Sequence, residues 1–112
     1  MSARGVIPLD YEVGAGATVI VEPYQVREAV IALRSVEAWC DSDPPSNVQL
    51  AILYGELQVY PSVGMVSLST KRFVDKLDAQ YYRGDKVRVK LKNLDTANAR
   101  RVWGNIEYEV VE

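Results

Sequence analysis

The sequence contains no histidine and only one cysteine among its 112 residues. Histidine is the commonest general base and transition-metal ligand in proteins, so its absence excludes Ser-His-Asp and Cys-His catalysis. The lone Cys40 excludes an intrachain disulfide and a cysteine-based zinc site. We expect Cys40 to be a buried structural thiol.

Long apolar runs are also missing. No stretch approaches the roughly 20 residues that cross a bilayer. The apolar patch between Gly5 and Pro8 is too short for the core of a signal peptide. We therefore expect a soluble protein made in a cytoplasm, with no membrane partner.

Strict alternation of apolar and charged residues is the clearest pattern present. It occupies residues 84–92 and 101–110 and is typical of strands with one buried face and one solvated face. We predict that these two strands pair in a register whose residue numbers sum to 195, with Val87 opposite Tyr108 and Val89 opposite Ile106. Opposite charges would then face each other outside, with Lys86 opposite Glu109 and Arg88 opposite Glu107.

The remaining segments predict an all-β fold, an antiparallel β-sandwich or small jelly roll of about seven to eight strands with at most one short helix. Residues 17–22 read as a strand that stops at Pro23, and residues 29–40 as a strand for which a helix over 25–33 is the alternative. A phase shift at Gly55 predicts a β-bulge or a tight turn. Residues 69–80 favour a helical turn capped by Thr70, or a crossing loop.

The apolar pattern divides the chain into two parts. Residues 1–16 are expected to be an N-terminal arm or edge strand, because Pro8, Gly14 and Gly16 interrupt the apolar pattern there. Residues 17–112 are expected to be a single β-sandwich domain.

Charge is unevenly distributed along the chain. The net charge is −2, but residues 71–101 hold ten basic and four acidic residues, which leaves that segment at +6 and the remainder at −8. Such a split can align molecules head to tail or hold the two halves of one sandwich together.

Acidic clusters give no clear catalytic or metal site. Asp41, Asp43 and Asn47 share a loop with the oxygen ligands that calcium uses, but the same residue types populate turns for their own backbone hydrogen bonds. Whether they bind an ion stays open, and we predict no metal, cofactor or catalytic residue. Glu107 and Glu109 are expected to form a solvated, ion-paired face.

Exposed basic and aromatic side chains are the candidates for binding. Lys86, Arg88, Lys90 and Lys92 form a basic row, but Glu107 and Glu109 are expected to neutralise part of it, which disfavours nucleic acid. Trp39, Tyr54 and Tyr108 are expected in the core, and adjacent Tyr81 and Tyr82 on opposite sides of a strand. Residues bordering loops are predicted to form protein interfaces, namely Tyr24, Tyr60, Tyr81, Tyr82, Arg100 and Arg101.

The segments Gly84–Val89, Asn93–Ala97 and Ile106–Val110 resemble the small β-sandwich and jelly-roll proteins of phage particles, of the minor capsid, decoration or head-completion type. The resemblance implies a non-enzymatic structural subunit of a virion, assembled in the host cytoplasm through contacts with itself and other subunits. It carries over no catalytic residue. The alternative is a ligand-binding β-sandwich module, with carbohydrate as the ligand of exposed Tyr or Trp.

Overall fold

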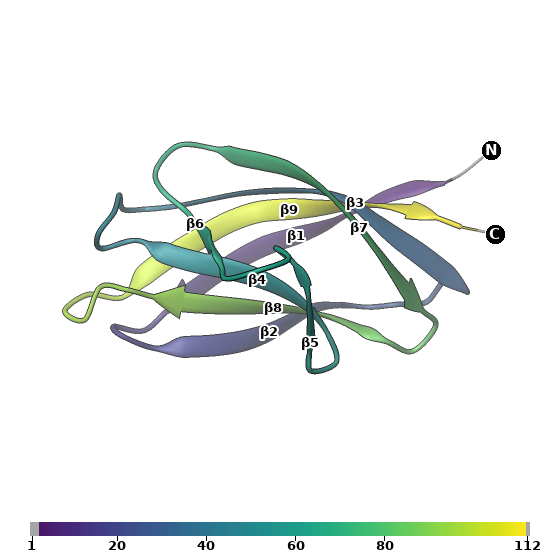
Figure 1. Cartoon of the computed structure of the whole chain (residues 1–112), viewed down its shortest axis with the longest axis horizontal. Helices are drawn as coiled ribbons and strands as arrows, with labels where there is room; N and C mark the ends of the chain where they lie inside the picture. Colours follow the sequence, from purple (N-terminus) through teal and green to yellow (C-terminus); the bar gives the residue numbers. More distant parts are fainter. Residues whose placement is uncertain (1–2, 112) are drawn as a thin grey trace.

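The computed structural model describes residues 3–111, and every regular element in that range is a strand (Figure 1). The nine strands are β1 (Arg4–Val13), β2 (Thr18–Gln25), β3 (Val30–Cys40), β4 (Val48–Tyr54), β5 (Leu57–Tyr60), β6 (Val66–Ser67), β7 (Phe73–Tyr82), β8 (Lys86–Asn93) and β9 (Arg100–Val110). The all-β prediction is confirmed. Residues 3–111 contain no helix of the length and apolarity needed to cross a membrane.

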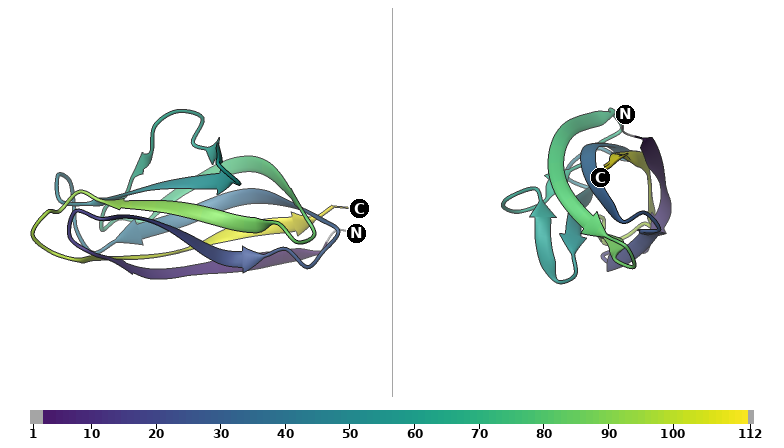
Figure 2. Two further views of the ribbon diagram at one scale, coloured as in Figure 1. Left: turned by 90° about the horizontal axis from the view of Figure 1, so that it is seen from below. Right: turned by 90° about the vertical axis from the view of Figure 1, so that its right-hand side faces the viewer.

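The strands form two antiparallel sheets that pack as a β-sandwich (Figure 2). One, here called the β9 sheet, has the order β1-β9-β3-β7. The other, here called the β8 sheet, has the order β2-β8-β4-β5, and β6 pairs with β4 beside that path. The segment from the β4–β5 turn to β6 stands away from the body of the sandwich in both views of Figure 2.

The core follows from the alternation in the sequence. In β8, Val87, Val89 and Leu91 are at most 1% exposed, and Val102 and Ile106 of β9 are fully buried. Burying one such aliphatic side chain contributes about 1.5–3 kcal/mol to stability. The predicted inward faces of these two strands are therefore confirmed.

The predicted pairing of these two strands is wrong, because they belong to different sheets. Val87 pairs with Tyr24 and Tyr54 in the β8 sheet, and Ile106 pairs with Ile7 and Val36 in the β9 sheet. The loop over residues 94–99 carries the chain from one sheet to the other instead of reversing it within one. Two strands in opposite sheets, whose buried faces meet across the core, show the same alternation of apolar and charged residues as two strands paired within one sheet.

The helical turn predicted for residues 69–80 is also wrong. Phe73 begins β7, which pairs with β3 and closes one edge of the β9 sheet. Phe73 and Leu77 pack against the core and Ala79 and Tyr81 are buried in it, so the inward positions recur every second residue. The backbone hydrogen bonds that β3 offers outweigh a weak helical spacing.

Other segment predictions have mixed outcomes. Residues 30–40 are a strand, so the alternative helix over 25–33 is absent from the described chain. Gly55 forms a tight turn between β4 and β5 with a φ of 58°, a conformation that glycine adopts without strain. The stop at Pro23 is wrong, because β2 continues to Gln25 through a register shift between Val21 and Tyr24.

Prolines lie within two strands, and both strands are sheet edges. Pro8 is in β1 at one edge of the β9 sheet, and Pro23 is in β2 at one edge of the β8 sheet. A proline has no N–H to offer to a further strand, so these edges are blunted against pairing with another chain. The expected division at residue 16 stays a prediction, while Ile7, Leu9 and Val13 of β1 contribute to the core.

Candidate functional site

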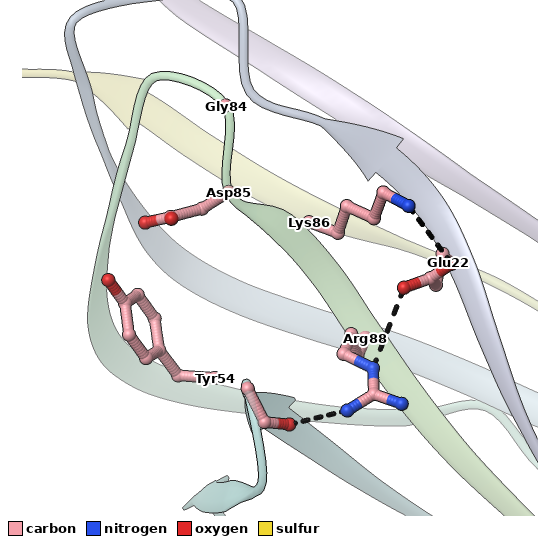
Figure 3. A pocket seen from close by; sticks show the side chains of 7 residues that line it. Glu22, Tyr54, Gly84, Asp85, Lys86 and Arg88 are labelled. Carbon is pink, nitrogen blue, oxygen red and sulfur yellow. Dashed lines mark hydrogen bonds and ion pairs between the residues drawn. The ribbon is translucent and has the colours of Figure 1, made fainter.

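A pocket of about 360 Å³ opens where the β4–β5 and β7–β8 turns meet at one end of the sandwich. It is lined by Glu22, Tyr54, Gly55, Gly84, Asp85, Lys86 and Arg88 (Figure 3). Gly55 and Gly84 both have positive φ, which lets the two turns fold tightly beside each other.

The charged groups of this pocket bind one another. The carboxylate of Glu22 lies 3.7 Å from Lys86 Nζ and 3.6 Å from Arg88 Nε. Arg88 Nη1 donates a hydrogen bond of 2.7 Å to the carbonyl of Gly55 (Figure 3). The same nitrogen pairs with Glu56 at 3.3 Å. Partly exposed ion pairs of this kind contribute little stability, but they fix the side chains in place.

The remaining polar groups of the pocket are also engaged. Asp85 Oδ2 accepts a hydrogen bond of 2.9 Å from the backbone N–H of Tyr82. Its hydrogen bond with Tyr54, together with burial, raises the pKa of the Tyr54 hydroxyl. Arg88 thus joins β8 to the β4–β5 turn, and Asp85 joins the β7–β8 turn to Tyr54 at the end of β4.

A second pocket of about 470 Å³ lies next to the first and is lined in part by Tyr24, Arg27 and Arg83. The Tyr24 ring stacks on Tyr108 with 5.5 Å between centroids, and both hydroxyls donate to the carboxylate of Glu28. The bond from Tyr24 is the main cause that lowers the pKa of Glu28, and burial raises the pKa of Tyr24. Both the ring and the hydroxyl of Tyr24 therefore make contacts within the molecule.

The four tyrosines predicted to form interfaces occupy different environments. Tyr82 is 49% exposed on β7, and its neighbour Tyr81 is fully buried, so their predicted opposite orientation is confirmed. The Tyr81 hydroxyl donates 2.7 Å to the carbonyl of Leu53 in the opposite sheet. Tyr60 is 7% exposed and donates 2.6 Å to Asp75 Oδ2. Burial is the first cause that raises the pKa of both buried hydroxyls, and neither ring offers a surface to a partner.

The two predicted interface arginines are held by carboxylates. Arg100 binds Asp95 Oδ2 through Nε at 3.0 Å and Nη2 at 2.6 Å. Backbone N–H bonds from Ala97 and Asn98, together with Arg100, lower the pKa of Asp95 to about 2. Arg101 binds Asp10 at 2.8 Å, which raises the pKa of its guanidinium. Arg101 is the more exposed of the two arginines.

The loop residues weighed as calcium ligands serve local structure. Asp43 Oδ1 accepts bonds from the backbone N–H and the hydroxyl of Thr70 at 3.0 and 2.9 Å, and the backbone bond is the first cause that lowers its pKa. Asn47 is 1% exposed and donates 2.9 Å to the carbonyl of Leu68. Within residues 3–111, no group of three or more acidic, histidine or cysteine side chains is arranged to hold a metal ion.

The outer face of the β9 sheet carries a feature that sequence reasoning missed. Trp39 of β3 lies directly opposite Trp103 of β9, and both are only partly buried. The Arg72 guanidinium lies 5.4 Å from the centroid of the Trp39 ring. The prediction of a core Trp39 is wrong because its neighbours Ala38 and Cys40 occupy the inward positions. Tyr54 and Tyr108 do pack against the core, as predicted.

The basic row of β8 lies on the outer face of the β8 sheet, away from the acidic residues of β9. Glu107 and Glu109 therefore do not neutralise it, and Glu22 and Glu56 pair with Lys86 and Arg88 instead. The prediction that Glu107 and Glu109 neutralise the basic row is therefore wrong. Strands in separate sheets present their polar faces to opposite sides of the molecule.

Comparisons with known proteins identify the fold. No family model matches the sequence, and no curated protein matches it significantly. A chain from the capsid of Helicobacter pylori bacteriophage KHP30 is similar in structure, with a TM-score of 0.56 and 11% identity over 97% of this chain and 93% of that chain. A chain from the disulfide-linked pili of Bacillus endospore appendages has a TM-score of 0.50 at 11% identity, covering 99% and 89%.

A third similar structure is the VP2 subviral particle of infectious bursal disease virus, with a TM-score of 0.52 and 7% identity. The similarity covers 97% of this chain and 32% of the VP2 chain, so this fold corresponds to about a third of that protein. The chain thus has a β-sandwich fold that also occurs in phage and viral capsid proteins, as the sequence resemblance suggested.

Proposed function

We propose that this chain is a non-enzymatic structural subunit of a virion or a similar large assembly. The main support is the similarity to the phage capsid chain, which extends over nearly the whole of both chains. The end pocket agrees with this role, since its charged groups hold one another and the adjoining turns. The chain then acts through its outer surfaces, in contact with copies of itself and with other subunits.

We place the protein in the virion after assembly in the host cytoplasm. Tyr82 and Arg101 are the contact residues that we keep from the sequence prediction, because both side chains are exposed. Exposed tyrosine and arginine are enriched at protein interfaces.

The test is copurification with particles. Particles from cells that produce the chain are banded on a density gradient, and the chain is quantified by mass spectrometry. We expect many copies per particle that stay bound through repeated banding. A chain found only in the unbound fraction would contradict the proposal.

The alternative function, a carbohydrate-binding module, is favoured by the partly exposed Trp39 and Trp103, which lie opposite each other on neighbouring strands. Aromatic rings with adjacent hydrogen-bonding groups suit the apolar faces of sugars. Binding on a glycan array that is lost in Trp103→Ala and retained in Tyr82→Phe would promote this function. The absence of glycan binding by the wild-type chain would exclude it.

A further inference from the structure

We propose that the second pocket binds an oxyanion, meaning a carboxylate or phosphate group, through the guanidinium groups of Arg27 and Arg83. The pocket of about 470 Å³ lies between the connection from β2 to β3 and the turn from β7 to β8. Ligand sites usually have volumes of roughly 300–1,000 Å³. The proposal goes beyond the structural role proposed above and does not depend on it.

The lining of this pocket carries positive charge without a counterion. Arg27 and Arg83 are its charged residues, and none of the residues that line it is an aspartate or a glutamate. Neither arginine has an ion pair within residues 3–111, whereas five other arginines of that range each bind at least one carboxylate. The first pocket differs, because two carboxylates line it together with two cations.

The carboxylates that are nearest in the sequence bond to other groups. Glu28 accepts hydrogen bonds from two tyrosine hydroxyls and from the backbone N–H of Arg27. Asp85 accepts a hydrogen bond from the backbone N–H of Tyr82 and lines the first pocket. Neither carboxylate forms an ion pair with Arg27 or Arg83 in the described part of the chain. Both guanidinium groups are therefore available to a ligand from solution.

Hydrogen bonds hold Arg83 in position before any ligand binds. Its Nε donates a hydrogen bond of 3.1 Å to the carbonyl of Arg27, so this side chain crosses from one loop to the other. The loops themselves are joined by the backbone N–H of Gly84, which donates to the carbonyl of Val26 at 2.9 Å, and by that of Arg83, which donates to the carbonyl of Ala29 at 3.1 Å. The two terminal nitrogens of Arg83 make no hydrogen bond within residues 3–111 and remain for a ligand.

This arrangement suits an oxyanion better than any other ligand. A guanidinium group is planar and always charged, and its parallel N–H donors match two oxygens of a carboxylate or a phosphate. Because Nε is already held, part of the ordering cost of binding is removed. A cation would be repelled by the two arginines, and an uncharged ligand would leave both charges without a partner.

The test is a nuclear magnetic resonance titration of the ¹⁵N-labelled chain with sodium phosphate and, separately, with sodium succinate, at an ionic strength held constant with sodium chloride. The side-chain Nε–H signals of Arg27 and Arg83 and the backbone signal of Gly84 should shift in a saturable manner with at least one of the two anions. Arg27→Gln and Arg83→Gln should each weaken that binding by about tenfold or more, since charge-assisted hydrogen bonds are lost. The anion that binds more tightly shows whether the ligand is of the carboxylate or the phosphate class.

The variant Arg83→Lys separates the planar donors from the charge alone. It keeps the charge but offers no pair of parallel donors, so it should also bind about tenfold more weakly. Arg27→Gln keeps the test decisive if changes at Arg83 disturb the turn, because the Arg27 side chain makes no hydrogen bond within residues 3–111. Arg4→Gln is the matched control, since it removes an exposed arginine of β1 outside the pocket and should bind as the wild type does.

Two kinds of result would overturn the proposal. One is a set of shifts that do not saturate with either anion, or that sodium chloride alone reproduces. The other is wild-type affinity in Arg27→Gln or in Arg83→Lys. Neither result bears on copurification with particles, which tests the proposed function separately.

Discussion

At the scale of single residues, the loop between β8 and β9 depends on a small buried polar network. Asn93 is 2% exposed and its side-chain amide donates to the carbonyls of Val13, Gly14 and Asn98. Asp95 is 6% exposed, accepts two backbone N–H bonds and binds Arg100. A fully satisfied network of this kind fixes one conformation, and here it fixes the crossing from the β8 sheet to the β9 sheet.

Asp95 should make stability depend on acid. Its folded-state pKa of about 2 lies below the usual value of about 3.9, so its contribution is complete above about pH 4 and is lost as the pH falls toward 2. The free energy of unfolding in urea should therefore be lower for Asp95→Asn than for the wild type at neutral pH. This difference should shrink at about pH 2. Exposed Asp41→Asn is the control, and a gap that does not narrow in acid would contradict the assignment.

Gly104 is required by a close approach of two strands. A Cβ at this position would overlap the backbone carbonyl of Glu37 and the Cα of Ala38 on β3. Gly104→Ala should therefore lower the free energy of unfolding by about 1–3 kcal/mol, since the strands must move apart. Gly14→Ala is the matched control, because its Cβ would meet Ala17 at 3.9 Å, an ordinary contact. Equal stability of the two variants would show that β3 and β9 are not packed this closely.

At the scale of elements, a buried hydrogen bond joins β7 of the β9 sheet to β4 of the β8 sheet. The Tyr81 hydroxyl reaches the carbonyl of Leu53 at 2.7 Å from a fully buried position. Tyr81→Phe should cost about 0.5–1.5 kcal/mol, because it removes the donor and keeps the ring. Tyr82→Phe changes an exposed hydroxyl and should cost nothing measurable. Chemical denaturation measures the free energy of unfolding of both variants. An equal loss in the two variants would contradict the buried hydrogen bond of Tyr81.

Periodicity in the sequence predicted which face of a strand is buried, but not which strand lies beside it. Val87, Val89 and Ile106 are buried as the alternation requires, because burial acts on each strand separately. Lys86 and Glu109 have opposite charges that suit cross-strand pairing, yet they lie in different sheets. Pairing is decided by the whole topology, and a short loop of six residues can turn or cross equally well.

Residues 69–80 show that local spacing alone does not predict whether a segment is a helix or a strand. Phe73, Val74 and Leu77 have a spacing that suits one face of a helix, and Thr70 suits a cap. The same residues form a strand once β3 offers an open edge. No local signal reports such an edge, because β3 is formed more than thirty residues earlier in the chain.

The site was predicted less well than the fold, for a related reason. Exposure of Tyr82 and burial of Tyr81 follow from alternation once the segment is known to be extended. The pairing of Trp39 with Trp103 needs the register of β3 on β9. The end pocket joins Glu22, Tyr54 and Asp85 from three distant segments, so only the fold brings them together.

At the scale of the whole molecule, the two outer faces differ in how their charges are arranged. The basic row of β8 points outward from one sheet. The outer face of the other sheet carries charges of both signs, since Arg34, Arg72 and Arg101 pair there with carboxylates. The end pocket holds ion pairs within the molecule, whereas Lys90 and Glu107 have none within residues 3–111. The unsatisfied electrostatics of the chain therefore lie where another molecule can reach them.

Salt provides a check on this account at the same scale. Exposed charges are screened over about 10 Å at 0.1 M salt and over about 3 Å at 1 M salt. Association through exposed charges such as Lys90 and Lys92 should therefore weaken as sodium chloride is raised. The stability of the single chain, which depends on its buried core, should change little over the same range. Light scattering and thermal unfolding measured on the same samples separate the two effects.

The most direct measurement is sedimentation velocity of the wild-type chain at low salt over a wide range of concentrations. If its outer faces build an assembly, the weight-average sedimentation coefficient should rise with concentration and fall again when salt is added. A chain that sediments as a monomer at every concentration and every salt would contradict the account.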